Sequence, residues 1–136
     1  MTLVDSNVLL DVVTDGQVWG DWSQTQLERA AARGPLIVND VIYAEVSTRF
    51  GSVGDVESML LDLKIDLVLI PREALFLAGK AYLQYRAAGG VRTSVLPDFF
   101  IGAHAAVEQL PLLTRDVRRY RSYFPTVNLI APEMEQ

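Results

Sequence analysis

Short apolar runs alternate along the chain with longer stretches in which apolar residues recur at helical spacing. Near-continuous apolar runs of this length are typical of strands buried on both faces of a parallel sheet. The runs read, in order, TLVD, LIV, DLVLI, LLT and VNLI. The pattern therefore predicts a three-layer α/β/α sandwich with a mostly parallel sheet of about five strands.

Capping and turn residues mark the predicted helices between these strands. Asn39 and Ser52 suit helix N-caps, whereas Pro71 and Pro97 suit the first turn of a helix. Glycines stop helices, as in the pair Gly89-Gly90. Helices are expected to begin near Asn7 and to cover residues 19–33, 41–50, 55–64, 72–88, 98–109 and 117–124.

Length and composition narrow the class of protein. A chain of 136 residues without low-complexity segments predicts a single domain, here residues 1–132, with a short tail at 133–136. No basic segment precedes the first apolar run, and Asp5 and Asp11 interrupt it. Neither a signal peptide nor a membrane span is therefore expected, and the cytoplasm is the default location.

Charge and cysteine content limit the chemistry. The formal charge of −5 argues against broad electrostatic binding of nucleic acid, so a nucleic-acid function needs a local basic surface. The chain has no cysteine, so a metal ion would have to bind oxygen atoms or His104, which is the single histidine. An isolated histidine forms no recognisable metal or nucleophile motif, and we expect His104 to have a structural role.

Three aspartates fall where the carboxyl edge of the sheet is expected. Asp5 ends the first strand, Asp116 follows the fourth, and Asp98 lies in the first turn of a helix. Ligands of open parallel sheets bind at this edge because loops and helix N-termini gather there. Each aspartate also has a simpler explanation, since aspartate caps helices and favours their first turns.

Glu45 is harder to explain as a cap. It lies inside a predicted helix, beside Val41, Ile42 and Val46, on the face expected to pack against the core. A buried carboxylate needs a partner or a cation, unless it reaches solvent or pairs with Arg49 one turn later. Glu45 therefore points to a site more strongly than any single aspartate does.

Four converging carboxylates would require a cation. At an effective dielectric constant of 20, two carboxylates 5 Å apart repel by roughly 3 kcal/mol. Hard oxygen ligands favour Mg²⁺ or Mn²⁺, and Mg²⁺ commonly shares its coordination sphere with phosphate groups. Convergence of Asp5, Glu45, Asp98 and Asp116 would therefore suit metal-assisted hydrolysis of a phosphodiester.

The same residues lie in segments that resemble the PIN-domain ribonucleases, and most closely the VapC toxins of prokaryotic VapBC toxin–antitoxin systems. The resemblance covers nearly the whole chain, from about Leu3 to Pro132, with the motifs in the order of the family. Four segments carry it: LVDSNVLLDV, DVIYAEV, LPDFFIGAHA and LLTRDVRRYRSYFPTVNLIAP.

The resemblance implies a metal-dependent endoribonuclease toxin. Asp5, Glu45, Asp98 and Asp116 would bind Mg²⁺ or Mn²⁺ and position the attacking water, with Ser6, Asn7 and Thr114 supporting them. It also implies a homodimer and a VapB-like antitoxin whose C-terminal segment covers the acidic site. Apolar residues of two helices are candidates for its groove: Trp19, Trp22, Leu27, Met59, Leu60 and Leu61.

Arginines interleaved with aromatic residues follow Asp116, and such a segment suits contacts with RNA phosphates and bases. An ordinary solvated helix face explains the segment equally well. The candidate RNA-binding residues are Arg115, Arg118 and Arg119, with Arg86 and Arg92 as weaker ones.

Two alternatives stay open. A phosphatase or receiver-like domain also places an aspartate after its first strand, but it usually needs a lysine near the phosphoryl group. The two lysines, Lys64 and Lys80, fall late in one helix and inside another, which argues against this class. The second alternative is a catalytically silent interaction module that keeps its carboxylates for structural reasons.

Overall fold

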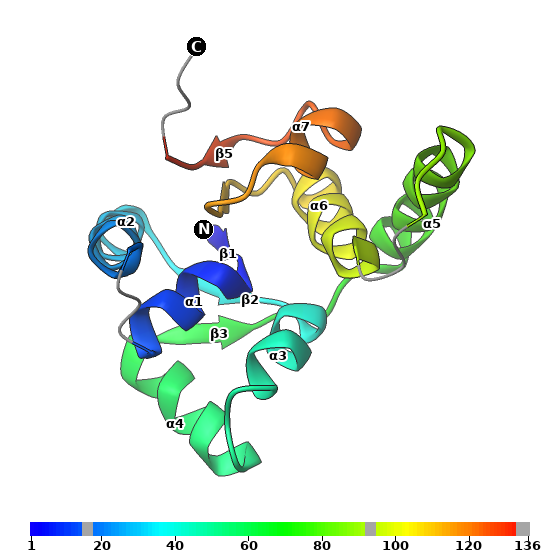
Figure 1. Cartoon of the computed structure of the whole chain (residues 1–136). Helices are drawn as coiled ribbons and strands as arrows, with labels where there is room; N and C mark the ends of the chain where they lie inside the picture. The colour runs from blue at the N-terminus through cyan, green and yellow to red at the C-terminus, as the bar shows by residue number, and fades with distance from the viewer. Residues whose placement is uncertain (15–17, 92–94, 133–136) are drawn as a thin grey trace.

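The computed structural model describes residues 1–14, 18–91 and 95–132, and shows one five-stranded sheet flanked by helices (Figure 1). Arg92 and the predicted tail at 133–136 lie outside the described residues. The order of the strands across the sheet is β3-β2-β1-β4-β5, and every neighbouring pair is parallel. The strands are β1 (Thr2–Val4), β2 (Leu36–Val38), β3 (Ile65–Leu67), β4 (Leu112–Leu113) and β5 (Leu129–Ile130).

The helices connect these strands and account for most of the described chain. Within the described residues, none of them is long and apolar enough to cross a membrane. They are α1 (Ser6–Val13), α2 (Gly20–Arg33), α3 (Asp40–Ser47), α4 (Val53–Leu63), α5 (Arg72–Ala87), α6 (Leu96–Glu108) and α7 (Arg118–Tyr123). The predicted three-layer architecture is confirmed.

Local capping explains where several helices begin. The Asp5 carboxylate accepts a hydrogen bond from the backbone N–H of Ser6, the Asn39 side chain accepts from Ile42, and Ser52 accepts from Asp55. Each of these side chains satisfies a backbone donor that the first turn of a helix leaves free. The predicted caps at Asn39 and Ser52 are therefore confirmed, and Asp5 is a cap in addition to any other role.

The direction of the crossovers creates a switch point between β1 and β4. The chain runs outward from β1 to β2 and β3, and then crosses back to β4 on the other side of β1. Right-handed crossovers place α1 to α4 on one face of the sheet and α5 to α7 on the other. Figure 1 shows α5, α6 and α7 gathered together, away from α2 and α4. A crevice at such a reversal is the usual place for a ligand site.

Several boundaries differ from the prediction by one or two residues, and two differ by more. The third strand covers Ile65–Leu67 rather than residues 66–70, because its partner β2 offers only Leu36–Val38 for pairing. Helix α3 ends at Ser47 rather than at Phe50. The hydroxyl of Thr48 hydrogen-bonds the carbonyl of Glu45 in that last turn.

The core holds the two layers of helices against the sheet and positions α6 and α7. The ring of Phe99 on α6 is fully buried and lies 6.1 Å from that of Phe124, which follows α7. Gly102 lets these elements approach, since a Cβ at this position would come within 2.3 Å of the Phe124 ring. The C-terminal part of the chain is thereby held against the helix that carries Asp98.

Candidate acidic site at the carboxyl edge of the sheet

Asp5 lies at the carboxyl end of β1, beside the switch point, with a side chain surrounded by donors. The residue is 4% exposed. Its Oδ1 accepts from the backbone N–H of Ser6 at 2.8 Å, while Oδ2 accepts from the hydroxyls of Thr114 (2.8 Å) and Tyr120 (2.9 Å). These bonds fix the orientation of the carboxylate.

Thr114 connects the ends of β1 and β4. Its hydroxyl donates to Asp5, and it accepts hydrogen bonds from the Asn7 side-chain amide (3.2 Å) and from the backbone N–H of Asp116 (3.2 Å). Asn7 also accepts from the backbone N–H of Arg115 at 3.3 Å. The predicted supporting residues Asn7 and Thr114 thus hold the loop that carries Asp116 against α1.

Glu45 reaches the same region from α3. Its Oε1 accepts a hydrogen bond of 2.9 Å from the hydroxyl of Ser6, the third predicted supporting residue. Glu45 is half-buried, and within the described residues it forms no ion pair with Arg49. Ser6 therefore lies between Asp5, which follows β1, and Glu45, which lies on α3.

Arginines of α7 partner the two remaining aspartates. Nε of Arg119 donates to Oδ2 of Asp98 at 2.8 Å, and the two side chains are 20% and 30% exposed. Arg118 contacts both carboxylate oxygens of Asp116, at 3.1 and 3.0 Å, but these side chains are 72% and 42% exposed. A pair as exposed as the second contributes little to stability, because solvent screens it.

Burial and mutual repulsion shift the carboxyl pKa values. Burial raises the pKa of Asp5 to about 6, although the bonds from Thr114 and Tyr120 oppose this, and the charge of Asp98 raises it further. Burial likewise raises the pKa of Glu45 to about 7, with added repulsion from Asp5 and Asp98. Burial also raises the pKa of Asp98, despite the hydrogen bond from Arg119. The hydrogen bond from Arg118 lowers the pKa of Asp116.

These couplings place the four predicted carboxylates in one electrostatic neighbourhood, which we call the acidic cluster: Asp5, Glu45, Asp98 and Asp116. Its donors are all hard oxygen atoms, as Mg²⁺ and Mn²⁺ prefer. In this arrangement, no three His, Cys, Asp or Glu side chains of the described residues lie close enough together to hold a metal ion. The oxygen donors of the acidic cluster thus fit a divalent cation in kind. In this arrangement, however, two of the four carboxylates pair with arginines.

The candidate RNA-binding arginines differ in their surroundings. Arg115 binds both carboxylate oxygens of Asp11, at 2.7 and 3.0 Å, and its guanidinium lies 5.8 Å from the centre of the Trp19 ring. Arg86 is exposed in the last turn of α5. Arg118 and Arg119 contact the acidic cluster directly, so the structure brings to the site two of the four candidates that lie in its described residues.

Two other residues discussed from the sequence, His104 and Lys80, contact side chains outside the acidic cluster. His104 is 1% exposed, and its Nδ1 is 3.0 Å from the side-chain amide of Asn39. Burial lowers the pKa of His104, which favours the neutral ring. Lys80 lies over the Phe76 ring at 5.3 Å, on the exposed side of α5.

The predicted apolar groove is only partly at the surface. Leu27, Met59 and Leu60 are buried in the core, whereas Leu61 is exposed and both tryptophans are half-buried. A hollow of about 580 Å³ does lie between α1 and α4, lined by apolar side chains such as Val13, Phe50 and Met59, with Asp55 and Asp62 at its rim.

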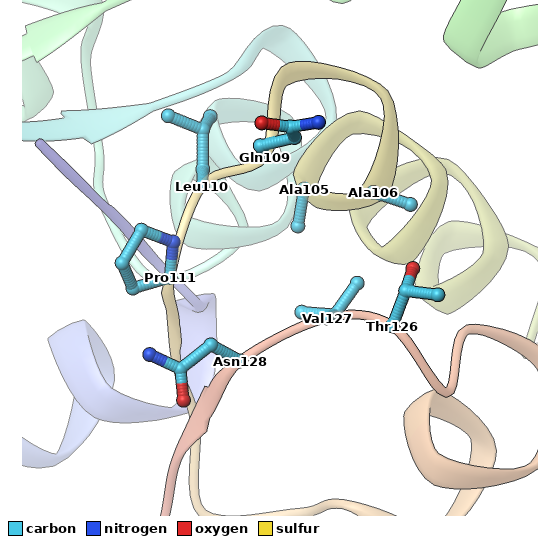
Figure 2. Close-up of a pocket in the computed structure, with 8 residues that line it drawn as sticks. All are labelled: Ala105, Ala106, Gln109, Leu110, Pro111, Thr126, Val127 and Asn128. Carbon is cyan, nitrogen blue, oxygen red and sulfur yellow. The ribbon is translucent and has the colours of Figure 1, made fainter.

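A second hollow lies at the amino ends of β4 and β5, at the edge of the sheet opposite to the acidic cluster. It has a volume of about 470 Å³ and is formed by the end of α6 and the segment before β5, with Gln109, Thr126 and Asn128 in its lining (Figure 2). None of its eight lining residues carries a titratable side chain. Its lining therefore offers no side-chain acid or base, and the acidic cluster remains the candidate active site.

Tyr120 and Asp11 are the residues that the sequence did not single out for this site. Tyr120 is 2% exposed and donates to Asp5, and burial beside that carboxylate raises its pKa well above 10. Asp11 follows Asn7 by one helical turn and holds the side chain of Arg115, with a further hydrogen bond from Ser23. The spacing of Asn7 and Asp11 on one helix face was the available signal for Asp11.

The PIN domain family model matches residues 2–124, so the chain belongs to this family. No curated protein sequence matches the chain significantly.

Solved structures agree in fold. VapBC2 from Rickettsia felis bound to a promoter DNA fragment aligns with a TM-score of 0.73 at 15% identity, over 97% of this chain and 98% of that one. A toxin–antitoxin complex from Klebsiella pneumoniae gives 0.67 at 21% identity, over 93% and 95%. VapBC-1 from nontypeable Haemophilus influenzae gives 0.70 at 13% identity, over 96% of both chains.

Proposed function

We propose that this protein is a VapC-type toxin, a divalent-metal-dependent endoribonuclease that a VapB-like antitoxin holds inactive. PIN domains are generally nucleases, which supports a hydrolase that cleaves phosphodiester bonds. The observation that carries the proposal is the meeting of Asp5 and Glu45 at Ser6, beside the switch point of the sheet, with the charge of Asp98 acting on both carboxylates. The fold shared with VapBC complexes supports the toxin role and the antitoxin partner.

Different residues of the chain would bind the cation, orient its ligands and attract the RNA. Asp5, Glu45, Asp98 and Asp116 would hold Mg²⁺ or Mn²⁺, and Ser6, Thr114 and Tyr120 would keep Asp5 and Glu45 oriented. When bound, the cation supplies Lewis-acid activation of water and neutralises charge on the phosphodiester. Arginines around the cluster would attract the RNA backbone, which offsets the net negative charge of the chain locally.

The test is RNA cleavage by the full chain, purified free of antitoxin, with Mg²⁺, with Mn²⁺ and with EDTA. We expect cleavage with either cation and none with EDTA. Asp5→Asn and Asp98→Asn should each lower the rate by two orders of magnitude or more, because each removes charge that holds the cation. Asp62→Asn, at an exposed position on α4, is the matched control and should cleave normally.

The silent interaction module is the second candidate, favoured by the pairing of Asp98 and Asp116 with arginines. A module of this kind would show no cleavage with either cation, and its Asp98→Asn variant would lose stability without losing any activity. Equal cleavage by the wild type and both cluster variants would instead assign the nuclease site to other residues.

A further inference from the structure

Consecutive residues of the short helix α7 contact three different members of the acidic cluster. Arg118 pairs with Asp116, Arg119 with Asp98, and Tyr120 donates to Asp5. The Arg118 contact is local and exposed, since its partner is two residues away. The Arg119 contact is different, because it joins α7 to α6 and both side chains are largely shielded from solvent.

The Arg119 guanidinium has one hydrogen-bonding partner among the described residues. Its Nε–H donates to Oδ2 of Asp98, and among the described residues this is the one hydrogen bond that its side chain makes. The remaining N–H groups of its fork are therefore available to another acceptor. The planar fork of an arginine matches a phosphate group, which can accept two parallel hydrogen bonds from it.

Arg115 provides an internal contrast. It binds both carboxylate oxygens of Asp11, while Ser23 also donates to that carboxylate and Trp19 lies beside the guanidinium. This arginine is held on several sides and has a structural role. Arg119 has one bond, to a carboxylate that already repels its acidic neighbours.

A cation at the acidic cluster would compete with Arg119 for Asp98, because both are positive partners of the same carboxylate. Once released, the guanidinium would lie at the rim of the site with its donors unsatisfied. An RNA phosphate is the acceptor that the proposed function brings to this place.

We propose that Arg119 is an exchangeable phosphate-binding residue, held by Asp98 in the metal-free protein and transferred to an RNA phosphate when a divalent cation takes its place. The inference rests on the proposed function and adds a coupling to it: cation binding and RNA binding strengthen each other through one side chain. Such coupling is reciprocal, so it can be measured from either ligand.

The first measurement is calorimetric titration of Mg²⁺ alone into wild type, Arg119→Ala and Arg121→Ala. Arg121 is exposed on α7 and makes no contact with the cluster among the described residues, so it is the matched control. Arg119→Ala should bind Mg²⁺ about fivefold more tightly or better, because the competitor is gone. Arg121→Ala should bind as the wild type does. Unchanged or weaker binding by Arg119→Ala would overturn the exchange.

The second measurement is fluorescence anisotropy with a labelled phosphorothioate RNA oligonucleotide, with and without Mg²⁺. The gain in RNA affinity on adding Mg²⁺ should be about fivefold smaller in Arg119→Ala than in wild type, and Arg119→Lys should lie between them, since lysine keeps the charge but loses the fork. An equal gain in all three proteins would contradict the proposal.

A third measurement uses Asp98→Asn, which removes the negative charge that holds Arg119. Without Mg²⁺ it should bind the oligonucleotide more tightly than Asp62→Asn, which has the same net charge. Equal affinities would count against a held arginine.

These outcomes separate the inference from the proposed function. If wild-type protein binds no Mg²⁺ and cleaves no RNA, both fail. If it binds Mg²⁺ and cleaves RNA while the Arg119 variants keep wild-type affinities for both ligands, only the exchange fails.

Discussion

Tyr120 donates its phenolic hydrogen to Oδ2 of Asp5 across 2.9 Å, although the two residues are 115 positions apart in the chain. The bond closes the buried side of the acidic cluster, because both residues have almost no exposed surface. Thr114 and Tyr120 donate to the same oxygen, Oδ2, of this carboxylate. The tyrosine therefore links α7 to the strand at the centre of the sheet.

Removing this hydroxyl should destabilise the protein measurably. Tyr120→Phe keeps the ring but leaves a buried carboxylate with one donor fewer, and hydrogen bonds to charged groups contribute about 1.5–3 kcal/mol. We expect a loss of this size in the free energy of unfolding, measured by urea denaturation in EDTA at neutral pH. Tyr123→Phe, on the same helix with a half-buried ring, should change it by less than about 0.5 kcal/mol. Equal losses in the two variants would show that the Asp5 contact contributes nothing.

The stability of the metal-free protein should fall as the pH rises from about 4 to about 7. Burial raises the pKa of Asp5 from 3.8 to about 6 and that of Glu45 from 4.5 to about 7. The folded chain therefore binds more protons than the unfolded chain in this window, which favours folding at its acidic end. For Asp5 alone the difference corresponds to about 3 kcal/mol.

Thermal unfolding in EDTA at a series of pH values measures this dependence. Asp5→Asn should flatten the profile, since asparagine does not titrate, and Asp62→Asn should leave it unchanged. The lowered pKa of Asp116 acts below the window, whereas the lowered pKa of His104 opposes the trend near pH 6 and reduces the fall in stability that Asp5 and Glu45 produce. A melting temperature that rises with pH between 5 and 7 would contradict the assigned burial of Asp5 and Glu45.

Thr114→Val should disrupt the connection between β1 and β4. Valine has nearly the same shape but cannot donate to Asp5 or accept from Asn7 and the backbone of Asp116. Leaving several buried polar groups unsatisfied should cost about 2–4 kcal/mol in the free energy of unfolding. The same substitution at Thr126, which is exposed, should change it by less than about 0.5 kcal/mol. Chemical denaturation of both variants makes the comparison.

Two of the three arginine–aspartate pairs in this region should differ in coupling energy. Asp11 is a buried partner held in a bidentate contact by Arg115, whereas Arg118 and Asp116 are both exposed. Double-mutant cycles with alanine should give about 1.5–3 kcal/mol for Arg115 and Asp11, and a clearly smaller coupling energy for Arg118 and Asp116. A larger coupling for the exposed pair would invalidate the distinction between a structural and a solvated arginine.

Much of the fold follows from local patterns in the chain. Continuous apolar runs predict the strands, and side chains such as Asn39 and Ser52 predict where helices begin, because a cap acts on backbone groups within one turn. The placement of Asp5 after β1 follows equally from the position of the strand. The end of β3 does not, because the length of the neighbouring β2 limits it.

The partners of the charged side chains depend on how the helices pack. In the sequence, Arg115, Arg118 and Arg119 belong to one basic segment, yet they face Asp11, Asp116 and Asp98 respectively. Arg118 reaches a neighbour two residues away, but the partner of Arg119 depends on the rotation of α7 and on the approach of α6, which contacts between residues far apart in the chain determine.

The identities and order of the acidic residues are thus properties of the sequence, because each acid has a recognisable position relative to a strand end or a helix face. Their separation into members bound by hydroxyls, such as Asp5, and members bound by arginines, such as Asp98, arises only in the folded chain. A hydrogen bond requires its two atoms to meet within about 3 Å, and chain folding alone brings together residues as distant as Asp5 and Tyr120.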